Sequence, residues 1–377
     1  MSKNKKCCDG KIKERLGRVG GQAVIEGVMM KAGNRTVTTC RKEDGSLVVA
    51  DGEFVSVRKK HKFLNIPLLR GVINFVEMMI LSFKTLNVSV ESLDLDDEKD
   101  NKKKEGEKGS TTTVIMVLGL VFGVLLALGL FILLPGLVSD LVAYLLARFA
   151  DVTLNQTLKA VIEGAAKVLI FISYLSLVSL MPDIKRTFMY HGAEHKSIAC
   201  FESGAELTPE NAKEYTRFHP RCGTSFMFVM ILIGIVVGII LNNLFPNLNR
   251  YVLSAIRILI LPIIVGIGYE FIMFAGKHDN FITRALSAPG LWMQRITTRE
   301  PTADMLEVAI ISLKCSLRDE FPEFKEFYEL REWEPKKEPE EESEKPEDTT
   351  EEAVEESAED AIGESTELTP CEVKPEE

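Results

Sequence analysis

The sequence predicts a mainly α, multi-spanning helical membrane protein with about four transmembrane helices, a small N-terminal β unit and a disordered acidic C-terminal tail. Apolar runs such as Val114–Val138 and Phe226–Leu241 indicate spans, because about 20 apolar residues in a helix cross ~30 Å of hydrocarbon. The formal net charge is −10, yet residues 332–377 contain 20 acidic and 4 basic residues and alone carry −16. The remaining chain is therefore basic, at +6.

The segment before the first apolar run begins with a basic leader, residues 1–18, which lacks the apolar stretch of a secretory signal peptide. Residues 19–61 alternate and are rich in Val, Thr and Gly, a composition that favours strands. Glu43-Asp44-Gly45 stands between two such runs and indicates a hairpin turn. We therefore expect a small β-rich cytoplasmic unit of about three or four strands.

Residues 62–95 are predicted to form an amphipathic helix. Pro67 stands where a helix would begin, and polar residues recur after it on one narrow stripe at helical spacing. Basic clusters flank the segment on both sides, and both should stay in the cytoplasm. We therefore favour an interfacial or re-entrant helix over a fifth span. Residues 96–112 are interpreted as a charged linker.

Residues 113–282 are predicted to form the four-helix membrane core. The central loop, residues 182–224, carries six Lys and Arg residues, whereas the loops on the other side carry only Arg148 and Arg250. Cytoplasmic loops are enriched in Lys and Arg, so we expect this loop and both termini in the cytoplasm of a bacterium, with the protein in its cytoplasmic membrane. Leu141–Ala150 is apolar but too short to cross alone. The expected spans are Thr113–Val138, Leu158–Met181, Ser225–Phe245 and Tyr251–Ala275.

Residues 283–331 are predicted to be a juxtamembrane helical segment, in which Thr302 caps a helix with an apolar stripe. The disordered acidic tail, residues 332–377, either recruits a protein partner or only solubilises the chain. The seven cysteines are odd in number and show no disulfide-like spacing, which is typical of a reducing compartment.

Two of the five histidines occur in the sequence "MYHGAEHKSIACF". His191 and His195 are one helical turn apart, and Glu194 precedes the second, which gives the H-x-x-E-H arrangement of inverted-motif zinc enzymes. Imidazoles at this spacing bind one metal ion, and a neighbouring carboxylate can take a proton from water. The pattern predicts a zinc (Zn²⁺) site, although Gly192 is a poor helix former.

A second element, "RFHPRCGTS", places His219 and Cys222 three residues apart, which is ligand-like spacing. Thr208-Pro209-Glu210 before it indicates a helix cap and first turn. Glu270 and His278 fall at the cytoplasmic end of the fourth expected span, so four histidines are predicted to share one membrane face.

Each of these features has a simpler interpretation. His191 and His195 can bind lipid headgroups at the interface without any metal, and Cys222 can be a buried inert thiol. Glu270 near a helix end can be structural, and His278 can form a helix-terminal polar pair. Glu26 in "GGQAVIEGVMM" is a further polar candidate near the site, with no spacing that supports it.

The motifs "GGQAVIEGVMM", "PLLRGVINFVEMM", "HGAEHKSI", "HPRCGTSF" and "APGLWMQRITTREP" occur together and in this order. With them, residues 18–318 resemble the YqhQ-like family of bacterial membrane proteins, a domain of unknown function. The resemblance implies a multi-spanning membrane protein and a predicted metal-dependent enzyme. It implies no substrate.

The leading hypothesis is a membrane-embedded zinc-dependent hydrolase, peptidase-like by analogy of motif. His191, His195 and His219 would hold the metal, and Glu194 would activate water. We expect a peptide or lipid-linked substrate at the lipid bilayer and no nucleic acid. The main alternative is a non-enzymatic scaffold, in which Cys222 completes a closed structural zinc site. A transporter or metal-responsive regulator is a third hypothesis, although the expected spans hold few charges.

Overall fold

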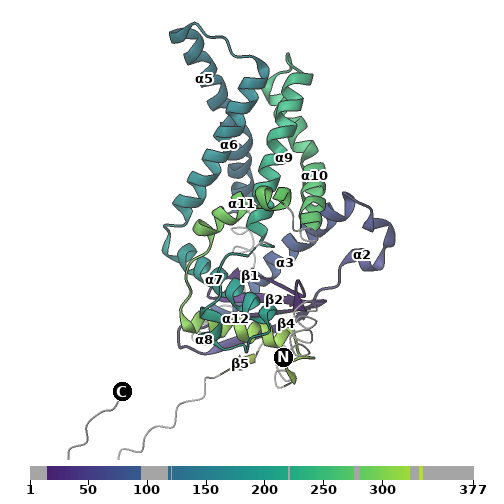
Figure 1. Cartoon of the computed structure of the whole chain (residues 1–377), viewed down its shortest axis with the longest axis vertical. Coiled ribbons are helices and arrows are strands. Elements are labelled where there is room, and N and C mark those ends of the chain that lie inside the picture. Colours follow the sequence, from purple (N-terminus) through teal and green to yellow (C-terminus); the bar gives the residue numbers. More distant parts are fainter. Residues whose placement is uncertain are drawn as a thin grey trace, which may run out of the picture. The chain divides into compact units, whose positions relative to one another are not determined.

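A computed structural model describes residues 15–94, 118–119, 121–219, 221–275, 281–322 and 331–333. The acidic tail after Trp333, the linker 96–112, leader residues 1–14 and His278 lie outside the described residues. The described chain is mainly helical with one antiparallel sheet, as Figure 1 shows. The predicted fold class is confirmed: a multi-spanning helical membrane protein with a small N-terminal β unit.

The sheet has the order β1-β2-β3-β4-β5, and every neighbouring pair is antiparallel. The predicted hairpin turn is present between β3 and β4, where Gly45 adopts a φ of +86°. The β1–β2 turn is shorter still and places Glu26 at a φ of +49°. The strands are β1 Val19–Val24, β2 Gly27–Ala32, β3 Arg35–Arg41, β4 Leu47–Glu53 and the short β5 Arg331–Trp333.

Helices cover both faces of this sheet. α7 (Pro182–Ser203) and α12 (Ala303–Ser316) pack on one face, and the Ser312 hydroxyl donates to the backbone carbonyl oxygens of Val28 (3.1 Å) and Val37 (2.7 Å). α3 (Leu69–Asp94) packs on the other face, where the Gln22 side chain bonds to Ser82 and Thr85. Neighbouring residues of a strand point to opposite faces, so β1 contacts both layers.

Three spans match the expectation closely: α6 (Gln156–Val178), α9 (Gly223–Leu244) and α10 (Arg250–Ala275). The first differs, because the long apolar helix runs from Val121 to Ala150 and so includes the segment thought too short to cross alone. A π-helical turn, η3 (Gly129–Leu133), directly precedes α5 (Leu134–Ala150) and its Pro135, whose missing N–H interrupts the hydrogen-bond ladder within this continuous helix. These four helices run side by side in Figure 1.

A fifth helix, α3, is also long and apolar enough to cross a membrane. Its first turns pack against the last turns of α10, and its later turns lie on the sheet. The side chains that it buries are mostly small or polar: Glu77, Leu81, Thr85, Ser89 and Ser92. Its exposed side is mainly apolar: Leu69, Phe75, Val76, Met79, Ile80, Phe83, Leu86 and Val90.

This distribution is the reverse of a helix on a water-soluble domain and is that of a helix whose free side meets lipid. Contact with the sheet along its later turns favours the interfacial position that the flanking charges predict, and that position stays a prediction.

The central loop expected over 182–224 is largely helical. α7 is followed by the short α8 (Pro209–Lys213), for which Thr208 accepts a bond from the N–H of Asn211, as its sequence predicts. The predicted cap at Thr302 is also present and accepts from the N–H of Met305. The remaining helices are α2 (Val57–Lys60), the 3-10 turn η1 (Lys62–Asn65) and α11 (Phe281–Thr297).

Candidate metal centre

The H-x-x-E-H motif lies in the middle of α7, and the helix continues through Gly192. The glycine is required by its surroundings, because a Cβ at this position would lie 2.0 Å from the carbonyl oxygen of Arg299. The segment between α11 and α12 therefore crosses α7 in direct backbone contact. The crossing places His191 beside the end of α11.

Three ligand atoms converge here, from His191, His195 and Cys222, all within 4.8 Å of one another. The Sγ of Cys222 is 3.4 Å from Nε2 of His191, and the two imidazole centroids are 4.4 Å apart. A tetrahedral zinc ion, with bonds of about 2.3 Å to sulfur and about 2.0 Å to nitrogen, separates such ligands by about 3.5 Å. The spacing of sulfur and nitrogen therefore fits two ligands of one ion.

Backbone carbonyl groups fix the orientation of both imidazoles. Nδ1 of His191 lies 2.8 Å from the carbonyl oxygen of Thr297, and Nδ1 of His195 lies 2.5 Å from that of Arg217. A carbonyl oxygen only accepts, so Nδ1 of each ring carries a proton, and in the neutral form of each ring Nε2 is the nitrogen with the lone pair. Histidines that bind metals are held in this way by their second nitrogen.

Burial reinforces this state for His195, which is 2% exposed. Removal from water lowers the pKa of this imidazole, because the charged form is poorly solvated there, although a contact with Cys222 acts in the other direction. The neutral form, which binds metals, is therefore favoured.

Glu194 is buried between α7 and strand β1. A Cβ on Gly21 would lie 3.1 Å from Cγ of Glu194, so the strand backbone covers this side chain. Burial raises the pKa of the carboxyl, while the charges of His191 and His219 and the N–H of Gly21 act in the other direction. The Oε2 atom is buried and has no hydrogen-bond partner among the described residues. A buried carboxylate oxygen without a partner is costly and needs a cation or a proton donor.

His219 lies next to this group but faces other partners. Its ring centroid is 5.5 Å from that of His195, whereas its Nε2 is 3.8 Å from a Glu202 oxygen and 3.3 Å from Arg221. The compact set of ligand atoms among the described residues therefore contains Cys222 and not His219.

Gln294 on α11, with a fully buried side chain, holds the loop that carries His219 and Cys222. Its side chain accepts from the N–H of His219 and donates to the carbonyl oxygen of the same residue, both at 2.8 Å. Arg217 fixes the other end of the loop by donating to the carbonyl oxygen of Thr298 at 2.6 Å. Neither residue was predicted from the sequence to belong to the site. A buried glutamine in "GLWMQRIT" has no motif, and only its isolation among apolar residues sets it apart.

The other polar candidates lie outside the compact group. Glu26 binds Arg186 and lies 3.3 Å from the hydroxyl of Tyr190, so it contacts the part of α7 that leads into the motif. Glu270 pairs with Arg70 and ties α10 to α3. Neither of these two contacts involves the histidines of α7.

The comparisons agree with the motifs. A family model described as "Protein of unknown function (DUF1385)" matches residues 66–319. An uncharacterized protein of Bacillus subtilis (strain 168), YqhQ, is 35% identical over an alignment of 308 residues that covers 79% of this chain and 92% of that protein. No solved structure matches the chain. The resemblance inferred from the motifs is confirmed, and the chain belongs to the YqhQ-like family of membrane proteins covered by the DUF1385 model.

Proposed function

We propose that this membrane protein is a zinc-dependent hydrolase whose centre is formed by His191, His195 and Cys222, with Glu194 as the proton acceptor. One observation carries the proposal. Backbone carbonyls bind Nδ1 of both imidazoles and leave Nε2 of each as the nitrogen for a metal, while a carboxylate oxygen beside them is buried without a hydrogen-bond partner among the described residues.

The set of three protein ligands favours catalysis over a purely structural role. Catalytic zinc sites have three protein ligands and one position for water or substrate, whereas structural sites are closed by four. A zinc ion supplies Lewis acidity, which makes a water molecule acidic enough to lose a proton near neutral pH. Glu194 is adjacent to His195 in the chain, and its Oε2 can accept that proton.

The location follows from the loop charges. The 182–224 segment carries the excess of Lys and Arg, so the centre and both termini are assigned to the cytoplasmic side of a bacterial cytoplasmic membrane. A centre at this level suits a peptide or a lipid-linked molecule at the bilayer surface, and not a nucleic acid. The acidic tail is assigned to a protein partner or to solubility.

The test begins with metal analysis of the purified full-length protein in detergent. We expect about one zinc per chain, and loss of most of it in His191→Ala and in Cys222→Ala, because removal of a ligand from a three-ligand set leaves two. Cys200→Ala is the matched control, since Cys200 is a buried thiol that lies in the core between α7, α12 and the sheet. Wild-type protein without zinc, or equal loss in the control, contradicts the metal centre.

Hydrolysis is then measured with a quenched peptide library and with lipid-linked ester substrates. Glu194→Gln should keep the zinc and lower turnover by about a hundredfold or more, the usual range for loss of a general base. Turnover that survives in Glu194→Gln contradicts the assigned role.

A structural zinc site is the second candidate, favoured by the burial of His195 and Cys222 and by the proximity of His219. In that arrangement His219 would rotate its ring to become the fourth ligand and close the site. His219→Ala should then release zinc, whereas the three-ligand centre keeps it. The same metal analysis separates the two.

A further inference from the structure

A stripe of one aromatic and two basic residues runs along α11 and just past its end. Trp292, Arg295 and Arg299 are spaced i, i+3 and i+7, and the helical hydrogen bonds continue to the residue before Arg299. At this spacing the three residues share one side of the helix. Trp292 is 69% exposed, Arg295 is exposed and Arg299 is partly buried. The buried residues on the other side of the helix are Met293, Gln294 and Thr297.

This stripe lies at the level where the spans end on the side of the candidate metal centre. Met293, the neighbour of Trp292 in the chain, packs with Leu175 of α6 and Phe228 of α9, each within two turns of the end of its span. Just beyond α6, Leu180 is 72% exposed, as expected of a side chain that meets lipid. An exposed tryptophan at this level is typical of the headgroup zone of a bilayer.

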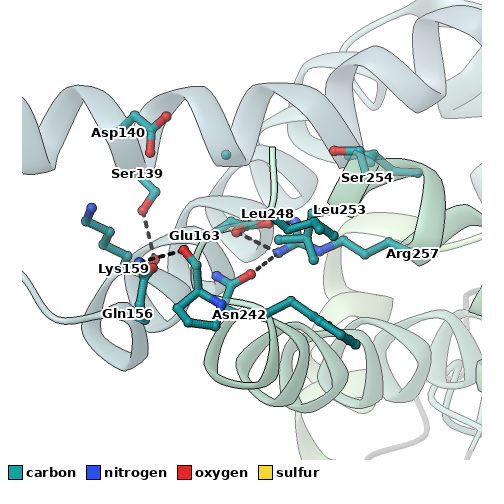
Figure 2. A pocket seen from close by; sticks show the side chains of 14 residues that line it. Ser139, Asp140, Gln156, Lys159, Glu163, Asn242, Leu248, Leu253, Ser254 and Arg257 are labelled. Atoms are coloured by element: carbon teal, nitrogen blue, oxygen red, sulfur yellow. Dashed lines mark hydrogen bonds and ion pairs between the residues drawn. The ribbon is translucent and has the colours of Figure 1, made fainter. Parts of the chain in front are cut away.

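The two arginines of the stripe lack a counter-charge. Among the residues that the structure describes, neither guanidinium group forms an ion pair or a hydrogen bond, and Nε of Arg299 is buried without a partner. Inside the bundle, by contrast, Arg257 donates to Glu163 and to Asn242, as Figure 2 shows. A partly buried guanidinium without a counter-charge is unfavourable, so an anion that reaches Arg299 is bound favourably.

The acidic residue next to the stripe in the chain has other partners. A carboxylate oxygen of Glu300 lies 3.0 Å from Nζ of Lys196, and the other lies 3.2 Å from Nε of Arg217. These ion pairs hold the Glu300 carboxylate at α7 and at the loop before α9. The positive charge of Arg295 and Arg299 therefore remains available to an anion from outside the protein.

The composition of the stripe selects the kind of anion. Guanidinium groups match the oxygen atoms of a phosphate, and two positive charges favour a lipid of net negative charge over one whose headgroup carries its own ammonium. The ring of Trp292 adds an apolar surface beside these charges. A phospholipid supplies phosphate and hydrocarbon at adjoining depths, whereas an acidic protein segment would supply only the charge.

We propose that Trp292, Arg295 and Arg299 bind the phosphate group of an anionic phospholipid of the surrounding bilayer. The site adjoins the candidate metal centre, because the backbone of Arg299 lies against Gly192 and the carbonyl oxygen of Thr297 accepts from His191. The lipid site requires neither zinc nor hydrolysis, so it stands or falls independently of the proposed function.

The test reads the lipid composition around Trp292 itself. The chain has two tryptophans, so Trp333→Phe leaves Trp292 as the single fluorophore of the full-length protein. The protein is placed in nanodiscs that contain equal parts of phosphatidylglycerol and phosphatidylethanolamine, with bromine on the acyl chains of one lipid or the other. Bromine quenches tryptophan at short range. We expect brominated phosphatidylglycerol to quench Trp292 more strongly, because each arginine should enrich the anionic lipid by about fivefold.

Variants in the same Trp333→Phe background then place the site. Arg295→Gln and Arg299→Gln should each lower the excess of phosphatidylglycerol around Trp292 by about fivefold. The Arg295 side chain forms no bond to the described part of the chain, so its replacement leaves the fold intact. Arg148→Gln is the matched control, since it removes an exposed charge near the end of α5, which precedes the start of α6 and so lies far from Leu175. Its quenching should equal that of the parent.

Three results would overturn the proposal. Equal quenching by the two brominated lipids would show that the stripe selects no anionic lipid. Absence of quenching by either lipid would show that the stripe is not in contact with the bilayer, as expected if an acidic protein segment covered it. An excess of phosphatidylglycerol that survives in either arginine variant would assign the selection to other residues.

Discussion

Gly192→Ala provides the sharpest test of the geometry around the candidate metal centre. Replacement of glycine by alanine within an exposed helix normally stabilises it by about 1 kcal/mol. Here the added methyl would lie 2.0 Å from the carbonyl oxygen of Arg299 and 3.2 Å from its carbonyl carbon. Carbon and oxygen atoms do not normally approach closer than about 3.3 Å, so the two backbones must separate by about 1.3 Å.

The expected cost follows from what this separation disturbs. Arg299 donates its N–H to the carbonyl oxygen of Phe188 at 2.8 Å, and Thr297, two residues earlier, accepts from His191. Overpacking costs about 1–3 kcal/mol, and each weakened hydrogen bond adds about 0.5–1.5 kcal/mol. The substitution should therefore destabilise the protein by about 2–5 kcal/mol, opposite in sign to the helix-propensity effect.

Thermal unfolding in detergent measures this effect, with Gly234→Ala as the matched control. Gly234 is also within a helix, α9, and a Cβ there would meet no atom within 4 Å. At roughly 2 °C per kcal/mol for a chain of this size, Gly192→Ala should lower Tm by about 4–10 °C. The control should change it little. A Tm of Gly192→Ala within about 1 °C of wild type, or an equal drop in Gly234→Ala, would refute the backbone crossing.

Three further expectations rest on other contacts. Burial raises the pKa of the Cys40 thiol to about 12, so the thiol stays protonated at pH 9. Iodoacetamide should therefore alkylate Cys40 only after the protein is denatured, which peptide mass mapping measures. Gln294→Leu leaves the N–H and the carbonyl oxygen of His219 without their partner, so it should lower the free energy of chemical unfolding by about 1–3 kcal/mol. An unfolding free energy equal to that of wild type contradicts this role. If α3 lies in the interface, tryptophans placed at Val76 and Val90 should be quenched at equal depth by brominated lipids, whereas a spanning helix separates them by about 21 Å.

Hydropathy predicted the spans α6, α9 and α10 well, because their side chains meet lipid over most of their length. It misplaced the end of the first span at Val138. The run is interrupted there by Ser139 and Asp140, which read as a helix boundary in the sequence. In the structure both residues lie inside one continuous helix that runs to Ala150, and they line a polar pocket among α5, α6, α9 and α10. A hydropathy average cannot separate a polar residue in a cavity from one in a loop.

The site was predictable only where its geometry is local. The i, i+4 spacing of His191 and His195 in a helix brings the two rings together, and the structure shows them 4.4 Å apart. The choice between His219 and Cys222 depends on the backbone path of the loop before α9, which Gln294 and Arg217 fix from other elements. The groups that hold Nδ1 of both rings are main-chain carbonyls, which every residue type provides. Sequence motifs therefore cannot reveal them.

Two glycines explain why a buried carboxylate can exist beside these ligands. Gly21 lets strand β1 cover Glu194, and Gly192 lets the segment after α11 cross the same helix, so backbone surrounds the motif on two sides. This enclosure removes water from Glu194, which is 5% exposed, and one of its oxygens has no hydrogen-bond partner in the part of the chain that the structure describes. A divalent cation held by the imidazoles and the thiol would supply positive charge next to this carboxylate. The buried oxygen of Glu194 that lacks a partner therefore lies where the candidate metal ligands converge.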